Sequence, residues 1–136
     1  MRALAVALVL LFACNREQDP LARLVSQLEE AAEDRDAGAV MEHVAASYAD
    51  RANVESTLRR YFFGYRVVEV HVRDLQTQIS GSQGWCTFRV DFTGIPKNIG
   101  GMDQFLPRAA TYRFELVCAE EGGRWRVTEA RYEEER

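Results

Sequence analysis

The sequence predicts an α+β domain in which two or three N-terminal helices pack on a curved, four-stranded antiparallel sheet. Apolar residues recur at helical spacing up to about residue 63, and from residue 66 they alternate with polar residues in four runs. The 136 residues are 47% hydrophobic and 28% charged, which is typical of one compact domain rather than a disordered chain.

The first helix is expected to begin at Pro20, behind an Asp19 N-cap, and to end near Asp34. Its apolar positions share one face: Leu21, Leu24, Val25, Leu28 and Ala32. Asp36 is expected to cap a second, short helix. A third helix is predicted from about residue 52 to 63, where Gly64 ends it.

Four strands are predicted at residues 67–79, 84–92, 110–118 and 124–132. In the first strand the alternation shifts phase, which predicts a β-bulge near Arg73 or Asp74. Glycines at 81–84 and 122–123 mark turns. The acidic tail, residues 133–135, is expected to be solvated.

The pairing of the two middle strands is predicted from their side chains. Phe88 opposite Leu116 and Phe92 opposite Tyr112 place apolar residues together, and the same register sets Arg89 opposite Glu115 and Asp91 opposite Arg113. Sliding by two residues would oppose like charges. The predicted register also places Cys86 opposite Cys118, so we expect a disulfide between them; two buried, reduced thiols are the alternative.

The N-terminus is typical of an export signal. Ten apolar residues, 3–12, follow Met1-Arg2, and the run ends in Leu11-Phe12-Ala13-Cys14. This ending resembles a bacterial lipobox, which implies that residues 1–13 are cleaved as a signal peptide and that Cys14 is acylated and anchors the chain to a membrane. Residues 14–19 would then be a short tether, and residues 20–136 the single domain.

The residue after the cysteine, Asn15, favours the periplasmic leaflet of the bacterial outer membrane over retention at the inner membrane. The alternative is an ordinary secretory signal in which Cys14 occurs by chance.

The domain resembles the nuclear transport factor 2-like superfamily. The resemblance rests on the helices, on Tyr61-Phe62-Phe63-Gly64-Tyr65 at the end of the third helix, on the strand meander, and on Gly-Gly-Arg-Trp-Arg-Val at residues 122–127. It implies a cone-shaped fold with a pocket at its open end, in a superfamily that contains both isomerase or dehydratase enzymes and non-catalytic binding modules. A cystatin-like fold, with one helix across a similar sheet, is the second choice.

Several functions are disfavoured by composition and spacing. A net charge of −4 argues against nucleic acid as a partner. His43 and His71 have no metal-ligand spacing, so we expect no metal and no cofactor. The predicted apolar sheet face carries one phenol, Tyr112, and no carboxylate, so we assign no catalytic residues. Acid–base catalysis through His43, Tyr48 or Asp50 stays open as the less favoured alternative.

We therefore expect a non-catalytic module that binds an apolar or amphipathic small molecule. The connection at residues 93–109 carries apolar side chains and is expected to act as a lid; otherwise it covers the domain's own core or contacts another protein. A protein-interaction or envelope-scaffold role, with a homodimer or an envelope protein as partner, is the alternative. The candidate pocket residues are Tyr61, Tyr65, Phe88, Val90, Phe92, Tyr112 and Phe114, with Phe105 and Leu106 in the lid.

Overall fold

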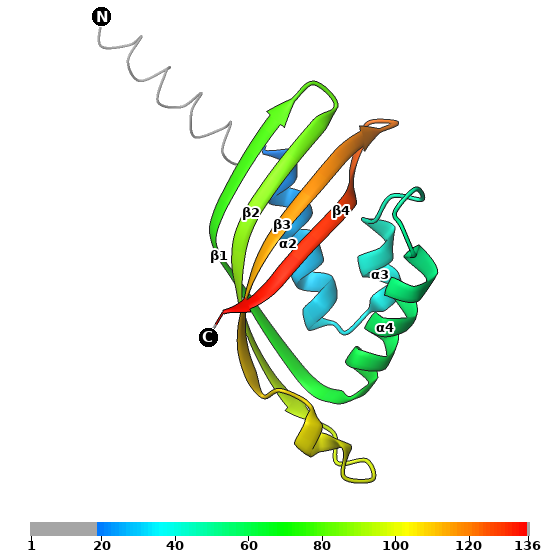
Figure 1. The fold of residues 1–136 in the computed structure, drawn as a ribbon, viewed down its shortest axis with the longest axis vertical. Coiled ribbons are helices and arrows are strands. Elements are labelled where there is room, and N and C mark those ends of the chain that lie inside the picture. Colours follow the sequence, from blue (N-terminus) through cyan, green and yellow to red (C-terminus); the bar gives the residue numbers. More distant parts are fainter. Residues whose placement is uncertain (1–18, 136) are drawn as a thin grey trace, which may run out of the picture.

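A computed structural model describes residues 19–135 of the protein (Figure 1). The predicted signal peptide and Cys14 lie outside the described residues, so the lipobox stays a prediction. The order of the elements is the predicted one: α2 (Pro20–Glu33), α3 (Ala37–Glu42), α4 (Arg51–Phe63), β1 (Tyr65–Ser80), β2 (Gln83–Pro96), the short 3₁₀ helix η1 (Met102–Phe105), β3 (Ala109–Glu121) and β4 (Arg124–Glu135). None of the helices within residues 19–135 is both long and apolar enough to span a membrane.

The first two helices begin at the predicted caps. The Asp19 carboxylate accepts hydrogen bonds from the backbone N–H of Leu21 (2.9 Å) and Ala22 (3.3 Å), and Asp36 accepts one from Ala39 N–H at 3.0 Å. These bonds satisfy amide donors that the first turn of a helix leaves unpaired. The start of α2 and the orientation of α3 therefore follow from local sequence.

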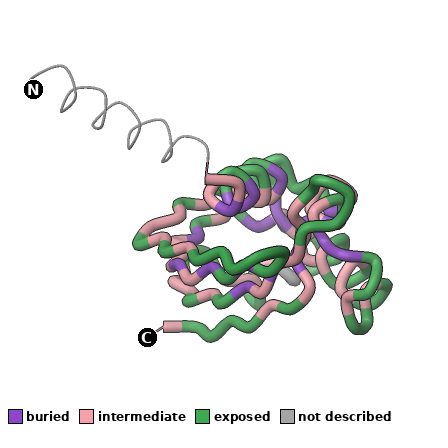
Figure 2. Tube along the Cα trace, turned by 90° about the horizontal axis from the view of Figure 1, so that it is seen from above, coloured by how far each residue is buried: buried purple, intermediate pink, exposed green. Residues whose placement is uncertain are grey.

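The four strands form one antiparallel sheet in the order β1-β2-β3-β4. The sheet is strongly curved, α2 lies across its concave face, and α3 and α4 continue along the same side (Figures 1 and 2). The predicted bulge is confirmed: the β1–β2 register shifts between Arg73 and Gln76, and Asp74 has a left-handed φ of 56°. The predicted α+β architecture, with three helices before the sheet, is confirmed.

The predicted register of β2 and β3 is wrong: in the structure the two strands are displaced by two residues from the predicted pairing. Phe88 lies opposite Phe114, and Arg89 lies opposite Arg113, a pairing that the sequence argument had disfavoured. The reason is that these charges pair with other strands. Arg89 contacts Glu135 of β4 at 3.2 Å and Asp74 of β1 at 3.3 Å.

The other charged residues of this pairing, Arg113 and Asp91, also have partners of opposite charge on the outer strands. Arg113 lies opposite Glu133 of β4. Asp91 accepts hydrogen bonds from Arg73 of β1 at 2.9 Å and from Thr111 of β3 at 3.0 Å. A two-strand argument omits these contacts, because a central strand has a partner on each side.

The acidic tail is part of the sheet, although Glu133 and Glu134 are exposed to solvent as predicted. Residues 133–135 continue β4, and Glu135 is half-buried against Arg89. Strand β2 also runs further than predicted, to Pro96, so the connection to β3 shortens to residues 97–108.

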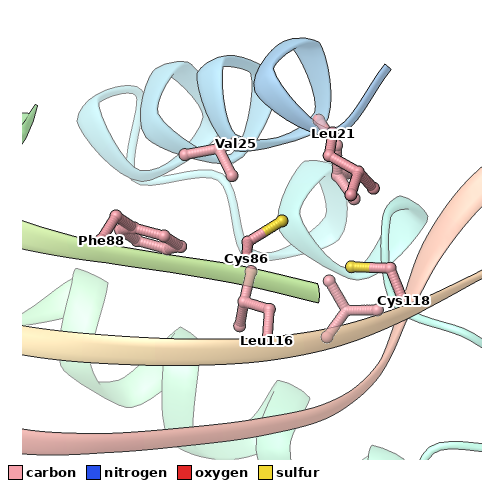
Figure 3. Close-up of a cluster of buried hydrophobic side chains, with 8 residues drawn as sticks. Leu21, Val25, Cys86, Phe88, Leu116 and Cys118 are labelled. Carbon is pink, nitrogen blue, oxygen red and sulfur yellow. The ribbon is translucent and has the colours of Figure 1, made fainter. Parts of the chain in front are cut away.

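The core has two parts. The larger, which we call the α2 core, joins the helix to the middle of the sheet (Figure 3). Its buried members are Leu21, Leu24, Val25, Cys86, Phe88, Leu116, Cys118 and Val127. The smaller, the Tyr65 core, contains Tyr65, Val68 and Phe92, with Leu106 packed against it. It lies where α4 meets β1.

Cys86 and Cys118 are not directly opposed, because Cys86 faces Leu116 and Cys118 faces Gly84 across the strands. Both are buried, free thiols in this structure, and both sulfur atoms lie on the side of the sheet that α2 covers (Figure 3). Interaction with the Cys118 thiol, then burial, raises the pKa of Cys86. The diagonal placement corrects the predicted face-to-face geometry; the disulfide itself stays a prediction.

Candidate functional site

Four aromatic rings form a continuous surface on the concave face of the sheet. Phe88 stacks on Phe114 with ring centroids 5.4 Å apart, and Phe114 stacks on Tyr132 at 5.5 Å. Tyr112 meets Phe114 and Tyr132 edge-on, at 6.3 and 6.2 Å. We call these four residues the aromatic ladder. It runs from the core into solvent, because Phe88 is 7% exposed, Phe114 and Tyr112 are half-buried, and Tyr132 is 69% exposed.

Three tyrosine hydroxyls converge beside the ladder. Tyr61 comes from the last turn of α4, Tyr65 is the first residue of β1, and Tyr112 lies on β3. The Tyr65 hydroxyl lies 2.7 Å from the carbonyl oxygen of Pro107 and 3.3 Å from the Tyr61 hydroxyl. The rings of Tyr61, Tyr65 and Phe92 also contact one another, with centroids 5.2 to 6.1 Å apart.

Burial raises the pKa of all three phenols. For Tyr112, burial and then the neighbouring Tyr61 phenol raise the pKa to about 12. Burial, then the hydrogen bond to Tyr65, raises the pKa of Tyr61 further still. Burial also raises the pKa of Tyr65. The cluster is therefore neutral at physiological pH.

A glycine makes room for the buried tyrosine ring. A Cβ atom at Gly94 would lie 2.6 Å from Cε1 of Tyr65, far inside van der Waals contact. Tyr65 is fully buried, so its ring has no free space into which to move. Gly94 thus allows the aromatic ring of β1 to lie flat on β2.

A carboxylate, Glu134, also lies on the concave side. It is opposite Tyr112 in the β3–β4 pairing, and its negative charge contributes to the raised pKa values of Tyr61 and Tyr112. The prediction that this face has no carboxylate is therefore wrong. The predicted strand, residues 124–132, already contained Tyr132, and continuing its alternation into the acidic tail would have located Glu134 as well.

Only some of the other predicted pocket residues lie at the surface of the site. Phe88 and Phe92 are buried in the two parts of the core, whereas Val90 is half-buried. Leu106 packs against the Tyr65 core, but Phe105 is 80% exposed. Of the two predicted lid residues, only Leu106 contacts the site.

The residues considered for acid–base catalysis, His43 and Asp50, form no hydrogen bond with Tyr48 or Tyr112 among the described residues. Burial, then Arg124, lowers the pKa of His43, which also has Glu42 and Arg126 nearby. The described part of the chain also holds no group of three metal-ligating side chains.

Two shallow hollows of about 550 Å³ lie elsewhere on the described residues. One is formed by the turn between α2 and α3, the C-terminal half of α4 and Lys97. The other borders β3 and β4 and includes Tyr132, the exposed end of the aromatic ladder. Four of its six lining residues, Arg113, Glu115, Arg131 and Glu133, lie on the face of the sheet opposite the ladder.

No protein-family model matches the sequence, and no curated protein matches it. Solved structures do resemble the fold. A candidate scytalone dehydratase from Novosphingobium aromaticivorans superposes with a TM-score of 0.73 at 10% identity, covering 88% of this chain and 85% of that one. A candidate dehydratase of the nuclear transport factor 2-like family from Streptomyces avermitilis gives 0.71 at 11% identity, over 87% and 95% of the two chains.

Bd1075 of Bdellovibrio bacteriovorus gives a TM-score of 0.72 at 12% identity and covers 88% of this chain, which spans only 42% of that protein. The fold is thus the nuclear transport factor 2-like one. At such low identity the likeness extends to the fold alone.

Proposed function

We propose that this protein is a bacterial lipoprotein, anchored through acylated Cys14 to the periplasmic leaflet of the outer membrane, whose concave sheet face binds an apolar or amphipathic small molecule without transforming it. The lipobox motif supports the anchor. The short tether, residues 14–19, would keep the domain close to the bilayer.

The observation that carries the binding proposal is the aromatic ladder. Stacked rings that pass from core to solvent offer apolar area to a ligand, and the tyrosine hydroxyls beside them offer polar groups that orient it. An aromatic protein surface that remains half-exposed in a folded domain is typical of a binding site.

The raised phenol pKa values support binding rather than catalysis. Efficient proton transfer needs a group whose pKa lies near the working pH. Tyr112, with a pKa of about 12, is far from that range. The described hydrogen bonds also provide no imidazole partner for it.

A fluorescence experiment tests the binding proposal. N-phenyl-1-naphthylamine, a neutral apolar probe, should bind the domain, and Tyr132→Ala should weaken its affinity several-fold, because an aromatic contact contributes about 0.5–1.5 kcal/mol. Tyr132 is mostly exposed, so its truncation should leave the melting temperature nearly unchanged. Phe105→Ala, also at an exposed ring, is the matched control and should bind the probe normally.

A second candidate function is protein interaction. Exposed apolar side chains gather around the start of β1, the end of β2 and the connection between β2 and β3: Phe63, Val67, Ile95, Ile99 and Phe105. If Phe105→Ala weakens probe binding and Tyr132→Ala does not, the apolar surface in use is this one, and the scaffold alternative replaces the ligand-binding proposal.

Metabolic labelling tests the anchor separately. Cells given an alkyne-bearing fatty acid should label the wild-type protein, and Cys14→Ser should abolish the label because the acceptor thiol is lost. Equal labelling of both proteins would contradict the lipoprotein proposal while leaving the binding site untouched.

A further inference from the structure

The exposed apolar side chains around the start of β1 and the end of β2 form one end of the domain, away from the concave face. We call them the tip patch: Phe63, Val67, Ile95, Ile99 and Phe105. Each is at least 40% exposed, and Phe105 is the most exposed of them at 80%. The domain therefore leaves apolar area at this end that its own core does not cover.

The chain segments that carry the tip patch are strongly basic. Residues 59–67 and 94–108 contain a single carboxylate, Asp103, and five cations: Arg59, Arg60, Arg66, Lys97 and Arg108. The whole chain, by contrast, has a net charge of −4. Arg59 pairs with Glu55 at 2.9 Å, but the other four cations have no ion-pair partner within residues 19–135. The tip is thus a local concentration of uncompensated positive charge on an acidic protein.

Lys97 joins this charge to the apolar surface. Its ammonium group lies 4.6 Å from the centroid of the Phe63 ring. The aliphatic stem of a lysine covers apolar surface while its charged end stays in water. The other charged residues that line the hollow beside this pair are two cations and two carboxylates: Arg35, Arg59, Asp34 and Asp36. Their charges balance, so the positive charge of Lys97 remains.

The shape of the tip favours insertion into a fluid layer. The connection between β2 and β3 projects from the end of the sheet and carries η1 (Figure 1), of which Phe105 is the last residue. A protein partner would need a hollow that matches this protruding ring, whereas the boundary between lipid headgroups and acyl chains admits single apolar side chains. Basic residues around such side chains are attracted to anionic lipids.

We propose that the tip patch docks on an anionic phospholipid surface. Phe105 and its apolar neighbours enter the boundary between headgroups and acyl chains, and the surrounding cations contact lipid phosphates. This contact is separate from the ligand-binding face and from the acyl chain on Cys14.

The proposed anchor does not by itself bring the tip to a membrane. Asp19, at the start of α2, accepts a hydrogen bond from Thr77, near the far end of β1, whereas the tip patch surrounds the beginning of that strand. The strand between these two points spans up to about 40 Å. Docking of the tip would therefore hold the domain lengthwise along the bilayer, with one contact at each end.

Quenching by brominated lipids tests the contact. Phe105→Trp places an indole at the tip, and the full chain is mixed with vesicles of brominated phosphatidylcholine with or without phosphatidylglycerol. In the anionic vesicles this indole should be quenched and its emission shifted to the blue, beyond any change shown by Trp85 and Trp125 in the wild type. High salt should reduce the effect, because it screens exposed charges.

Two matched controls locate the contact. Tyr132→Trp places an indole at another exposed ring, on the concave face of β4, and should show no added quenching. In the Phe105→Trp protein, Arg66→Gln should lower the equilibrium constant for docking about fivefold, the contribution of one basic residue near an anionic surface. Arg131→Gln removes the same charge from an exposed position on β4 and should leave docking unchanged.

Three results would overturn the proposal. Without added quenching in Phe105→Trp, the tip patch would be left to a protein partner. Equal quenching of Tyr132→Trp, or equal effects of Arg66→Gln and Arg131→Gln, would show nonspecific adsorption instead of docking by the tip. Quenching of the same size without phosphatidylglycerol would remove the role of the cations and the preference for an anionic surface.

Discussion

The Tyr65 hydroxyl donates a 2.7 Å hydrogen bond to the carbonyl oxygen of Pro107, and so joins the first residue of β1 to the end of the connection between β2 and β3. Two backbone hydrogen bonds hold the same segment at its ends: Lys97 N–H to Gly64 O at 2.8 Å and Gly94 N–H to Arg108 O at 2.9 Å. Both ends of the predicted lid are therefore held, one by the C-terminus of α4 and the other by β2, while Phe105 between them is exposed.

Removing this hydroxyl should loosen the connection. Tyr65→Phe keeps the buried ring but leaves the Pro107 carbonyl without its donor, so we expect a loss of about 1 kcal/mol in the free energy of unfolding. Amide hydrogen exchange in residues 97–108 should accelerate. Tyr132→Phe, which changes an exposed ring, is the control. Unchanged exchange in Tyr65→Phe would show that the backbone bonds alone hold the segment.

Adding one methyl group at Gly94 should destabilise the fold. In Gly94→Ala the new Cβ would lie 2.6 Å from the Tyr65 ring, and such overpacking costs about 1–3 kcal/mol. Gly38→Ala is the control, since its nearest contact is at 3.4 Å and Ala favours a helix. Urea denaturation of both variants measures the difference. A Gly94→Ala protein as stable as Gly38→Ala would contradict the tight contact.

The tyrosine cluster should make the fold sensitive to alkali. The pKa of Tyr112 is about 12 in the folded protein, above its ordinary value of 10.0, so the unfolded chain loses this proton first. Stability should be unaffected by this group below pH 10 and should fall as the pH rises from 10 to 12. Denaturation curves at increasing pH should fall less steeply for Tyr112→Phe than for wild type. Identical slopes would contradict the raised pKa.

The two buried cysteines should be oxidised in exported protein. Both thiols are buried on neighbouring strands, on the same side of the sheet (Figure 3), and the periplasm is an oxidising compartment. A bond closing the loop from Cys86 to Cys118 should add roughly 3–4 kcal/mol to the free energy of unfolding. Unfolded, unreduced protein purified from the periplasm should show no titratable thiol at these positions, whereas two would contradict the disulfide.

Local features of the fold were predictable from the sequence because each depends on residues close in the chain. The Asp19 and Asp36 caps, the bulge at Asp74 and the glycine turns arise from hydrogen bonds or φ angles within a few residues. Periodicity predicted which side chains of β2 and β3 face the helices. The aromatic composition of the candidate site followed from that alternation.

What required the tertiary structure was the alignment of segments far apart in sequence. The register of β2 with β3 depends on Asp74 and Glu135, which come from the two outer strands. The hydrogen bond of the Tyr65 hydroxyl depends on the carbonyl of Pro107, and the carboxylate opposite Tyr112 comes from Glu134 of β4. The sequence by itself therefore determined the elements and their apolar faces, because these follow from local periodicity and capping. Only the packed sheet decided which charges and hydroxyls meet, because each central strand balances its side chains against two neighbours at once.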